Sequence, residues 1–120
     1  MKKVTLVLGA SLKENRYSHK AIKKLKANGI AVVGLGAVSG VVDNVIIESE
    51  KKLFKNIDTV TLYLNPKRQE LYYEYIIDLQ PRRVIFNPGT ENLEFVKLLK
   101  ENTIETKVAC TLVLLNMNTY

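Results

Sequence analysis

The chain has 120 residues, of which 47% are hydrophobic and 25% charged, and it carries a net charge of +6. This length suits one domain with a single hydrophobic core, which we predict to span residues 1–120. The single cysteine excludes an internal disulfide, one histidine with one cysteine excludes a structural zinc site, and no apolar stretch is long enough to cross a bilayer. Without a secretory leader, a cytoplasmic protein that binds no metal is expected.

The positive charge is concentrated at the start of the chain. Residues 1–30 contain eight basic side chains and one acidic side chain, a net +7, whereas the remaining 90 residues carry a net −1. We therefore expect the surface built by the first 30 residues to receive a polyanion. For Lys20, Lys23, Lys24 and Lys26, a solvated helix face is the preferred explanation. Arg16, which lies in a predicted loop, is the stronger candidate for binding.

The first predicted elements form a β-loop-α-β unit. An apolar strand over residues 3–8 ends in the small residues Gly9, Ala10 and Ser11, and helical periodicity runs from residue 16 to residue 28. A short apolar strand over residues 30–33 follows. Small side chains let backbone N–H groups approach a ligand, and a helix N-terminus attracts negative charge. The pattern therefore predicts an anion site, with phosphate as the expected anion.

The rest of the chain alternates strand and helix patterns. We expect residues 34–36 to break the chain, 45–47 to form a brief strand and 49–54 to form a helical turn. Further strands are predicted at 58–64, 82–86 and 107–110. Asn65 and Pro66 predict a helix start, Pro81 its end, and the buried face of this helix is predicted to comprise Leu71, Tyr72, Tyr75, Ile76 and Leu79. A helix with Phe95, Val96 and Leu99 inside is expected after residue 90, and a short helix near the C-terminus.

This alternation predicts an α/β fold with five parallel strands in the order 3-2-1-4-5. In such a sheet the chain reverses direction between strands 1 and 4, and ligands bind outside the carboxyl ends of strands at this switch point. The loops at 9–17 and 87–91 would then face each other. Gly9, Ser11, Asn87 and Gly89 are therefore expected in one crevice.

The glycine loop differs from that of a dinucleotide-binding domain. Such domains show G-x-G-x-x-G at this turn and a carboxylate at the end of the second strand. Here Ser11 and Glu14 stand where the later glycines would be, and Val33-Gly34-Leu35 supplies no carboxylate. An NAD-linked oxidoreductase is therefore disfavoured, although it remains an alternative.

The opening motif resembles that of a known family. Gly9-Ala10-Ser11, four residues, and then Arg16-Tyr17-Ser18 are similar to the G-A-S-x4-R-x-S opening of the small CoA-binding-domain proteins, which are related to the nucleotide-binding domain of succinyl-CoA synthetase. The resemblance extends to residues 87–92 and to Cys110. It implies a three-layer Rossmann-like domain in which the glycine loop and first helix hold the phosphates of CoA or an acyl-CoA. Arg16 would be the ion partner, and Ser11 and Ser18 the hydroxyl donors.

We therefore interpret the chain as a stand-alone binding domain for CoA or acyl-CoA without catalytic machinery, and a nucleic-acid-binding domain is a further alternative. His19 lacks the partners of a general base, and packing explains Tyr63, Tyr72, Tyr73 and Tyr75. The C-terminal segment is a candidate homodimer surface. The predicted cofactor-binding residues are Gly9, Ala10, Ser11, Arg16, Tyr17, Ser18, Gly36, Asn65, Lys67, Asn87 and Gly89.

Overall fold

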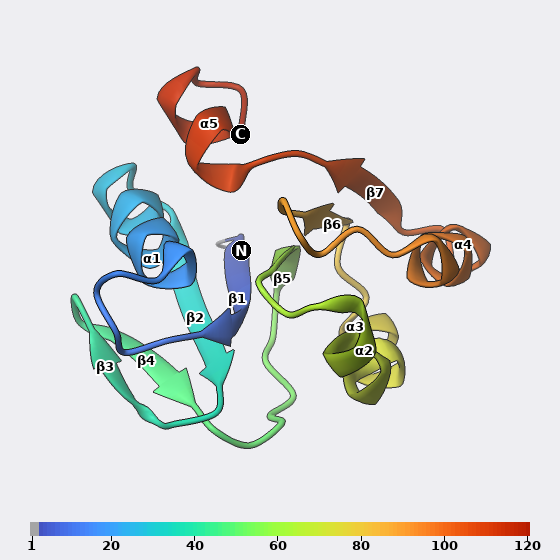
Figure 1. Cartoon of the computed structure of the whole chain (residues 1–120), viewed down its shortest axis with the longest axis horizontal. Coiled ribbons are helices and arrows are strands. Elements are labelled where there is room, and N and C mark those ends of the chain that lie inside the picture. Colours follow the sequence, from blue (N-terminus) through green and yellow to red (C-terminus); the bar gives the residue numbers. More distant parts are fainter. Residues whose placement is uncertain (1–2) are drawn as a thin grey trace.

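The computed structural model describes residues 3–120, which form one seven-stranded sheet with helices on both faces (Figure 1). The strands are β1 (Val4–Ala10), β2 (Ala31–Gly36), β3 (Gly40–Val42), β4 (Val45–Glu48), β5 (Ile57–Leu62), β6 (Arg83–Phe86) and β7 (Glu105–Val108). The helices are α1 (Tyr17–Ala27), α2 (Pro66–Gln69), the 3₁₀ turn η1 (Glu70–Tyr72), α3 (Tyr73–Leu79), α4 (Leu93–Glu101) and α5 (Thr111–Asn116).

The sheet confirms the predicted α/β class and corrects the predicted strand order. Its order is β3-β4-β2-β1-β5-β6-β7, and all neighbours pair in parallel except β3 with β4. The third long strand, β5, therefore lies beside β1, whereas the sequence pattern placed it beside the second strand. The chain reverses direction between β1 and β5, so this is the switch point of the sheet.

A hairpin accounts for the changed order. Residues 40–48 form β3 and β4, and β4 pairs in parallel with β2. This pairing occupies the edge of β2 where the third strand was expected, so β5 adds to the free side of β1. The predicted helical turn at residues 49–54 is wrong, because this segment crosses towards β5 without helical structure.

The glycines at positions 34 and 36 do not break the chain as predicted. They lie within β2, which continues to Gly36. A Cβ on Gly36 would overlap the carbonyl oxygen of Ala10, and one on Gly34 would lie 3.0 Å from Ile47 Cγ1. Glycine is used here because β1, β2 and β4 approach one another too closely for larger residues.

Two hydrophobic layers hold the helices on the sheet. On one face α1 and α5 pack against the sheet. The layer between them and the strands includes Val7, Ile22, Leu25 and Leu115, all at most 5% exposed. On the other face α3 and α4 cover a larger core that includes Leu6, Leu62, Phe86 and Phe95, each 1% exposed or less. Figure 1 shows the two helix layers on opposite sides of the strands.

The helix predicted after Asn65 is divided into α2, η1 and α3. Tyr75 and Ile76 are buried as predicted, but Leu71 is 73% exposed and its predicted place in the core is wrong. The 3₁₀ turn at Glu70–Tyr72 advances each residue by a larger angle than an α-helix does, so Leu71 turns away from the core.

The C-terminal residues form the expected short helix, α5. Leu114 and Leu115 are buried within the chain, where α5 contacts α1, while Met117 is 66% exposed. Packing inside the chain thus accounts for the two leucines, and the homodimer stays a prediction. Within residues 3–120, none of the helices has the length and apolar character needed to span a bilayer.

Candidate functional site

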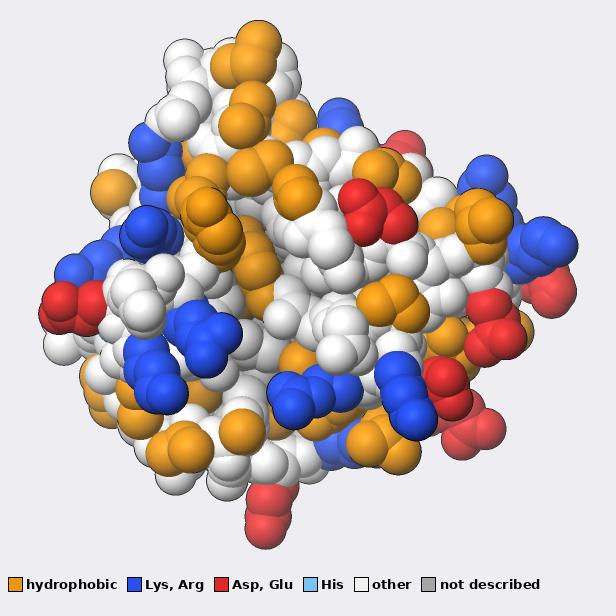
Figure 2. Space-filling model, viewed as in Figure 1, with side chains coloured by type: hydrophobic (Ala, Val, Ile, Leu, Met, Phe, Trp, Pro, Cys, Tyr) orange, Lys and Arg blue, Asp and Glu red, His pale blue; other side chains and the backbone are white. Residues whose placement is uncertain are grey.

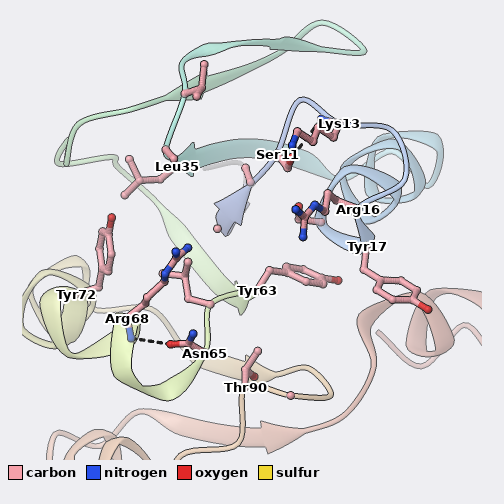
Figure 3. Close-up of a pocket in the computed structure, with 18 of the residues that line it drawn as sticks. Ser11, Lys13, Arg16, Tyr17, Leu35, Tyr63, Asn65, Arg68, Tyr72 and Thr90 are labelled. Carbon is pink, nitrogen blue, oxygen red and sulfur yellow. Dashed lines mark hydrogen bonds between the residues drawn. The ribbon is translucent and has the colours of Figure 1, made fainter.

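A cavity of about 850 Å³ opens at the carboxyl ends of β1 and β5 (Figure 3). The loop at residues 9–18 forms one wall, the segment at 63–72 forms the opposite wall, and residues 35–38 and 88–90 complete the lining. The volume falls within the range of about 300–1,000 Å³ that is usual for small-molecule sites. No side chain of the described residues fills this space, so the switch point of the sheet holds an open site.

The glycine loop turns sharply where β1 ends. Gly9 has φ +90°, a conformation that side-chain-bearing residues rarely adopt, and a Cβ on it would lie 2.8 Å from the carbonyl oxygen of Tyr63. The amide of Tyr63 in turn donates to the carbonyl of Leu8 at 2.8 Å. These contacts bring the two walls together at the base of the cavity, and Ala10 and Ser11 then turn towards α1.

The N-terminus of α1 faces the cavity with its backbone donors free of side-chain caps. Arg16 occupies the N-cap position without a side-chain hydrogen bond, and the first turn contains no acidic residue. The first N–H groups of a helix have no intrahelical acceptor, and the helix dipole adds positive potential there. Tyr17 and the buried Ser18 line the cavity at this point, so the first turn is suited to bind an anion.

His19 fixes the glycine loop to α1. This side chain is 6% exposed, and its Nδ1 lies 3.1 Å from the carbonyl oxygen of Ser11. Because a carbonyl oxygen can only accept, Nδ1 is the donor in this bond, and Nε2 is buried without a hydrogen-bond partner in the described chain. Ser11 Oγ accepts from the amide of Lys13 at 3.1 Å. The histidine therefore positions the loop and does not line the cavity.

The opposite wall is the short helix α2 and the residues around it. Asn65 caps this helix by accepting from the amide of Arg68 at 2.9 Å, which confirms the predicted helix start. Gln69 is fully buried, and its Nε2 donates to the carbonyls of Leu64 and Thr90, both at 2.8 Å. Gln69 Oε1 accepts from Asn92 Nδ2 at 3.0 Å. These bonds tie α2 to the loop after β6.

The loop after β6 has a structural centre in Asn87. Its Nδ2 donates to Thr61 Oγ1 at 2.6 Å and to the carbonyl of Leu62 at 2.9 Å, and its Oδ1 accepts from the amide of Thr111 at 2.8 Å. Asn87 is 2% exposed and does not line the cavity. The amide of Gly89 donates to Glu91 Oε1 at 2.8 Å, so this amide is already paired.

The lining of the cavity is cationic and aromatic. Lys13 and Arg16 lie on the α1 side, Arg68 lies on the α2 side, and no carboxylate is among the lining residues. Burial raises the pKa of Tyr63 to about 12, so its phenol is neutral at physiological pH. Figure 2 shows Lys and Arg side chains on both sides of the hollowed centre of this face. The site is thus electrostatically favourable for an anion.

The structure brings most of the predicted site residues together. Lining the cavity are Gly9, Ala10, Ser11, Arg16, Tyr17, Ser18, Gly36, Asn65 and Gly89. Lys67 is exposed on α2 and does not line it, and Asn87 is buried beneath it. The predicted crevice is also corrected: the loop at 9–17 faces the segment after β5, because β5 lies between β1 and β6.

Sequence reasoning missed several residues that line the cavity, among them Lys13, Arg68, Tyr63 and Tyr72. Arg68 follows the Asn65 cap at the carboxyl end of β5, a segment from which the sequence analysis selected Asn65 and Lys67 instead. The predicted packing role is confirmed for these tyrosines: Tyr63 and Tyr72 pack against the two cores while also lining the cavity. Tyr73 stacks on Phe95 at 4.3 Å between ring centroids. Within residues 3–120, no three His, Cys, Asp or Glu side chains are grouped as metal ligands.

Comparisons with known proteins agree with this architecture. Residues 3–116 match the family described as CoA binding domain. A comparison with curated proteins gave no match. One solved structure, described only as that of an uncharacterized protein, is 45% identical to this chain and superposes with a TM-score of 0.95, covering 100% of this chain and 99% of the other.

Two further structures share the fold at lower identity. A hypothetical protein from Pyrococcus horikoshii OT3 is 28% identical, with a TM-score of 0.81 over 93% of this chain and 80% of the other. A protein from Thermus thermophilus, described as cell-free ID.343, is 22% identical, with a TM-score of 0.87 over 99% of this chain and 91% of the other.

Proposed function

The chain belongs to the CoA binding domain family, and from this premise we propose that it binds CoA or an acyl-CoA in the cavity at the carboxyl ends of β1 and β5. The observation that carries the proposal is the uncapped N-terminus of α1, which faces an open cavity beside Gly9 and Arg16. Free backbone donors, a helix dipole and a guanidinium at one place form a site for a diphosphate.

The proposed binding mode assigns a role to each part of the wall. The amides at residues 9–11 and 17–18 donate to the diphosphate, and Arg16 pairs with its oxygens. The hydroxyls of Ser11 and Ser18 supply further donors. The pantetheine arm then follows the cavity past Tyr63 towards residues 88–90, where Gly89 leaves open space.

We propose binding without catalysis, because the only histidine is committed to the backbone of the glycine loop. A catalytic role would require a nucleophile next to an activated base. Incubation of the protein with acetyl-CoA should release free thiol no faster than buffer does, as measured with a thiol reagent. Faster release would contradict this part of the proposal.

A thermal-shift panel tests the function with CoA, acetyl-CoA, ADP, ATP, NAD and a random DNA duplex. A ligand at ~100 times its dissociation constant should stabilise the protein by about 2.7 kcal/mol. We expect CoA and acetyl-CoA to give the largest shifts. A shift with NAD alone would support an oxidoreductase, and a salt-sensitive shift with DNA alone would support a nucleic-acid binder; either result would overturn the proposal.

A further inference from the structure

The cavity carries positive charge on two separate walls. Lys13 and Arg16 belong to the loop that leads into α1, whereas Arg68 belongs to α2 on the other side. Figure 3 shows the Arg68 side chain directed into the cavity, towards the space between Tyr63 and Leu35, opposite Arg16. One diphosphate at the N-terminus of α1 accounts for Arg16 and leaves the guanidinium of Arg68 without an anion.

The backbone of Arg68 is held in place, and its exposed side chain is unpaired within the described chain. Its amide is bound by the Asn65 cap, and the next residue, Gln69, is fully buried with three hydrogen bonds that fix α2 to the loop after β6. Within residues 3–120 the guanidinium itself has neither a carboxylate partner nor a hydrogen bond. An unpaired cation that extends from a fixed helix into a cavity is available to a ligand.

The surroundings of Arg68 suit a nucleoside. Leu35 and Leu64 give that side of the cavity apolar surface, and Tyr72 adds an aromatic ring with Lys51 Nζ 5.1 Å from its centroid. Such surface suits a purine base. The strand β2 ends at Gly36 and is followed by Ala37 and Val38, so no carboxylate stands where nucleotide-binding sheets commonly hold free ribose hydroxyls. The nearby carboxylate of Glu48, the register neighbour of Leu35 on β4, pairs with Lys52 at 3.4 Å and is not among the lining residues.

The geometry points to Arg68 as the residue that binds the 3′-phosphate on the ribose of CoA, which makes the site selective for CoA over nucleotides without that phosphate. This inference rests on the proposed function. CoA carries two anionic groups on different sides of its ribose, the 5′-diphosphate and the 3′-phosphate, and the cavity offers cations on two walls. A phosphate monoester carries about −1.5 to −2 charge at neutral pH, and a guanidinium binds it through two hydrogen bonds.

Titration calorimetry with CoA and dephospho-CoA, which differ only by the 3′-phosphate, tests this assignment. The unmodified protein should bind CoA at least roughly tenfold more tightly, as expected for one charge-assisted interaction. Arg68→Gln should weaken CoA binding by about ten- to a hundredfold and change dephospho-CoA binding by less than about twofold. The variant should therefore bind the two ligands almost equally.

Two matched variants distinguish binding of the 3′-phosphate by Arg68 from a general effect of losing one positive charge. Lys67→Gln removes the same charge from the neighbouring residue, which does not line the cavity, and should retain the preference for CoA. Lys13→Gln removes a cation from the opposite wall and should weaken both ligands to the same extent. Equal loss of both ligands in Arg68→Gln, or loss of the preference in Lys13→Gln, would overturn the assignment.

The outcomes also separate this inference from the proposed function. If the unmodified protein binds both ligands with equal affinity, CoA binding stands and the role of Arg68 is wrong. If it binds neither ligand, the proposed function is wrong and the assignment falls with it. Competition between CoA and adenosine 3′,5′-bisphosphate adds an independent measurement. This ligand should compete better than 5′-AMP, which differs from it only by the 3′-phosphate, and should lose that advantage in Arg68→Gln.

Discussion

The α-carbon of Gly9 lies against the backbone of Tyr63, so that a Cβ at position 9 would be 2.8 Å from the Tyr63 carbonyl oxygen. This contact joins the two loops of the switch point at the base of the cavity. We expect Gly9→Ala to lower the free energy of unfolding by roughly 2–4 kcal/mol. The alanine would have to adopt the positive φ of Gly9, and its Cβ would also overlap the backbone of Tyr63. Urea denaturation measures the change, and CoA affinity should fall in parallel.

Gly29→Ala is the matched control for this prediction. Gly29 has φ +75°, but no atom of residues 3–120 would lie within 4 Å of a Cβ at this position. This substitution should cost only the conformational penalty, roughly 1 kcal/mol. Equal destabilisation by the two variants would show that the contact with Tyr63 contributes nothing.

Arg16→Ala should weaken CoA binding by roughly 1.5–3 kcal/mol, the usual contribution of a hydrogen bond to a charged group. Arg16 is exposed at the N-cap of α1, so the stability of the protein should change little. Calorimetry should be run beside Lys23→Ala, which removes the same charge from an exposed position of α1 outside the cavity lining. Unchanged CoA affinity in Arg16→Ala would show that Arg16 does not bind the phosphates.

Asn87→Ala should lower the stability of the protein and should affect CoA binding only through that loss. The substitution removes three hydrogen bonds that join β5, the loop after β6 and the start of α5, and it leaves buried groups unpaired. We expect a loss of roughly 2–4 kcal/mol in unfolding free energy. Asn102→Ala, which removes one exposed bond to Leu98, should cost less than about 1 kcal/mol. Normal stability with abolished CoA binding would instead place Asn87 in direct contact with the ligand.

Asp58 should make stability depend on pH in acid. The hydrogen bond from the Arg82 side chain lowers the pKa of the Asp58 carboxyl below its usual value. A carboxyl with a lowered pKa in the folded state stabilises the protein above its unfolded pKa, about 3.9, and this contribution is lost as pH falls through the folded pKa.

The comparison with Asp58→Asn isolates this contribution. Because Arg82 is half exposed, solvent screens the pair, and the variant should lose at most about 1 kcal/mol at pH 7. Urea titrations from pH 7 to pH 2.5 should show the difference between the two proteins shrinking below about pH 4. If the difference in unfolding free energy between the two proteins stays constant over this pH range, the lost stability comes from packing and not from the charge of Asp58.

The first β-α-β unit was predictable because its signals are local. The small residues from Gly9 to Ser11, the apolar face with Ile22 and Leu25, and Gly29 after the helix each fix one conformation without help from distant segments. The Gly9 loop and Arg16 could therefore be placed at the site from the sequence alone.

The strand order required information of a different kind. The order depends on which strand pairs with the free edge of β2. The hairpin that takes this edge forms around the turn at Asp43 and Asn44, both of which have positive φ. An Asp-Asn pair between β-branched residues is a hairpin signal, but it does not indicate which strand the hairpin will join. The position of Arg68 opposite Arg16 follows from that order, so the sequence pattern did not reveal it.

The buried amide of Gln69 has a consequence for how the cavity adapts. It links the carbonyls of Leu64 and Thr90 and the side chain of Asn92, so the wall that carries Arg68 and the loop after β6 behave as one stiff body. Widening or narrowing of the entrance must then come from the other side, from residues 12–16 and 37–39. Ligands of different bulk would be accommodated by bending that side, which leaves the backbone that carries Arg68 unchanged from one ligand to the next.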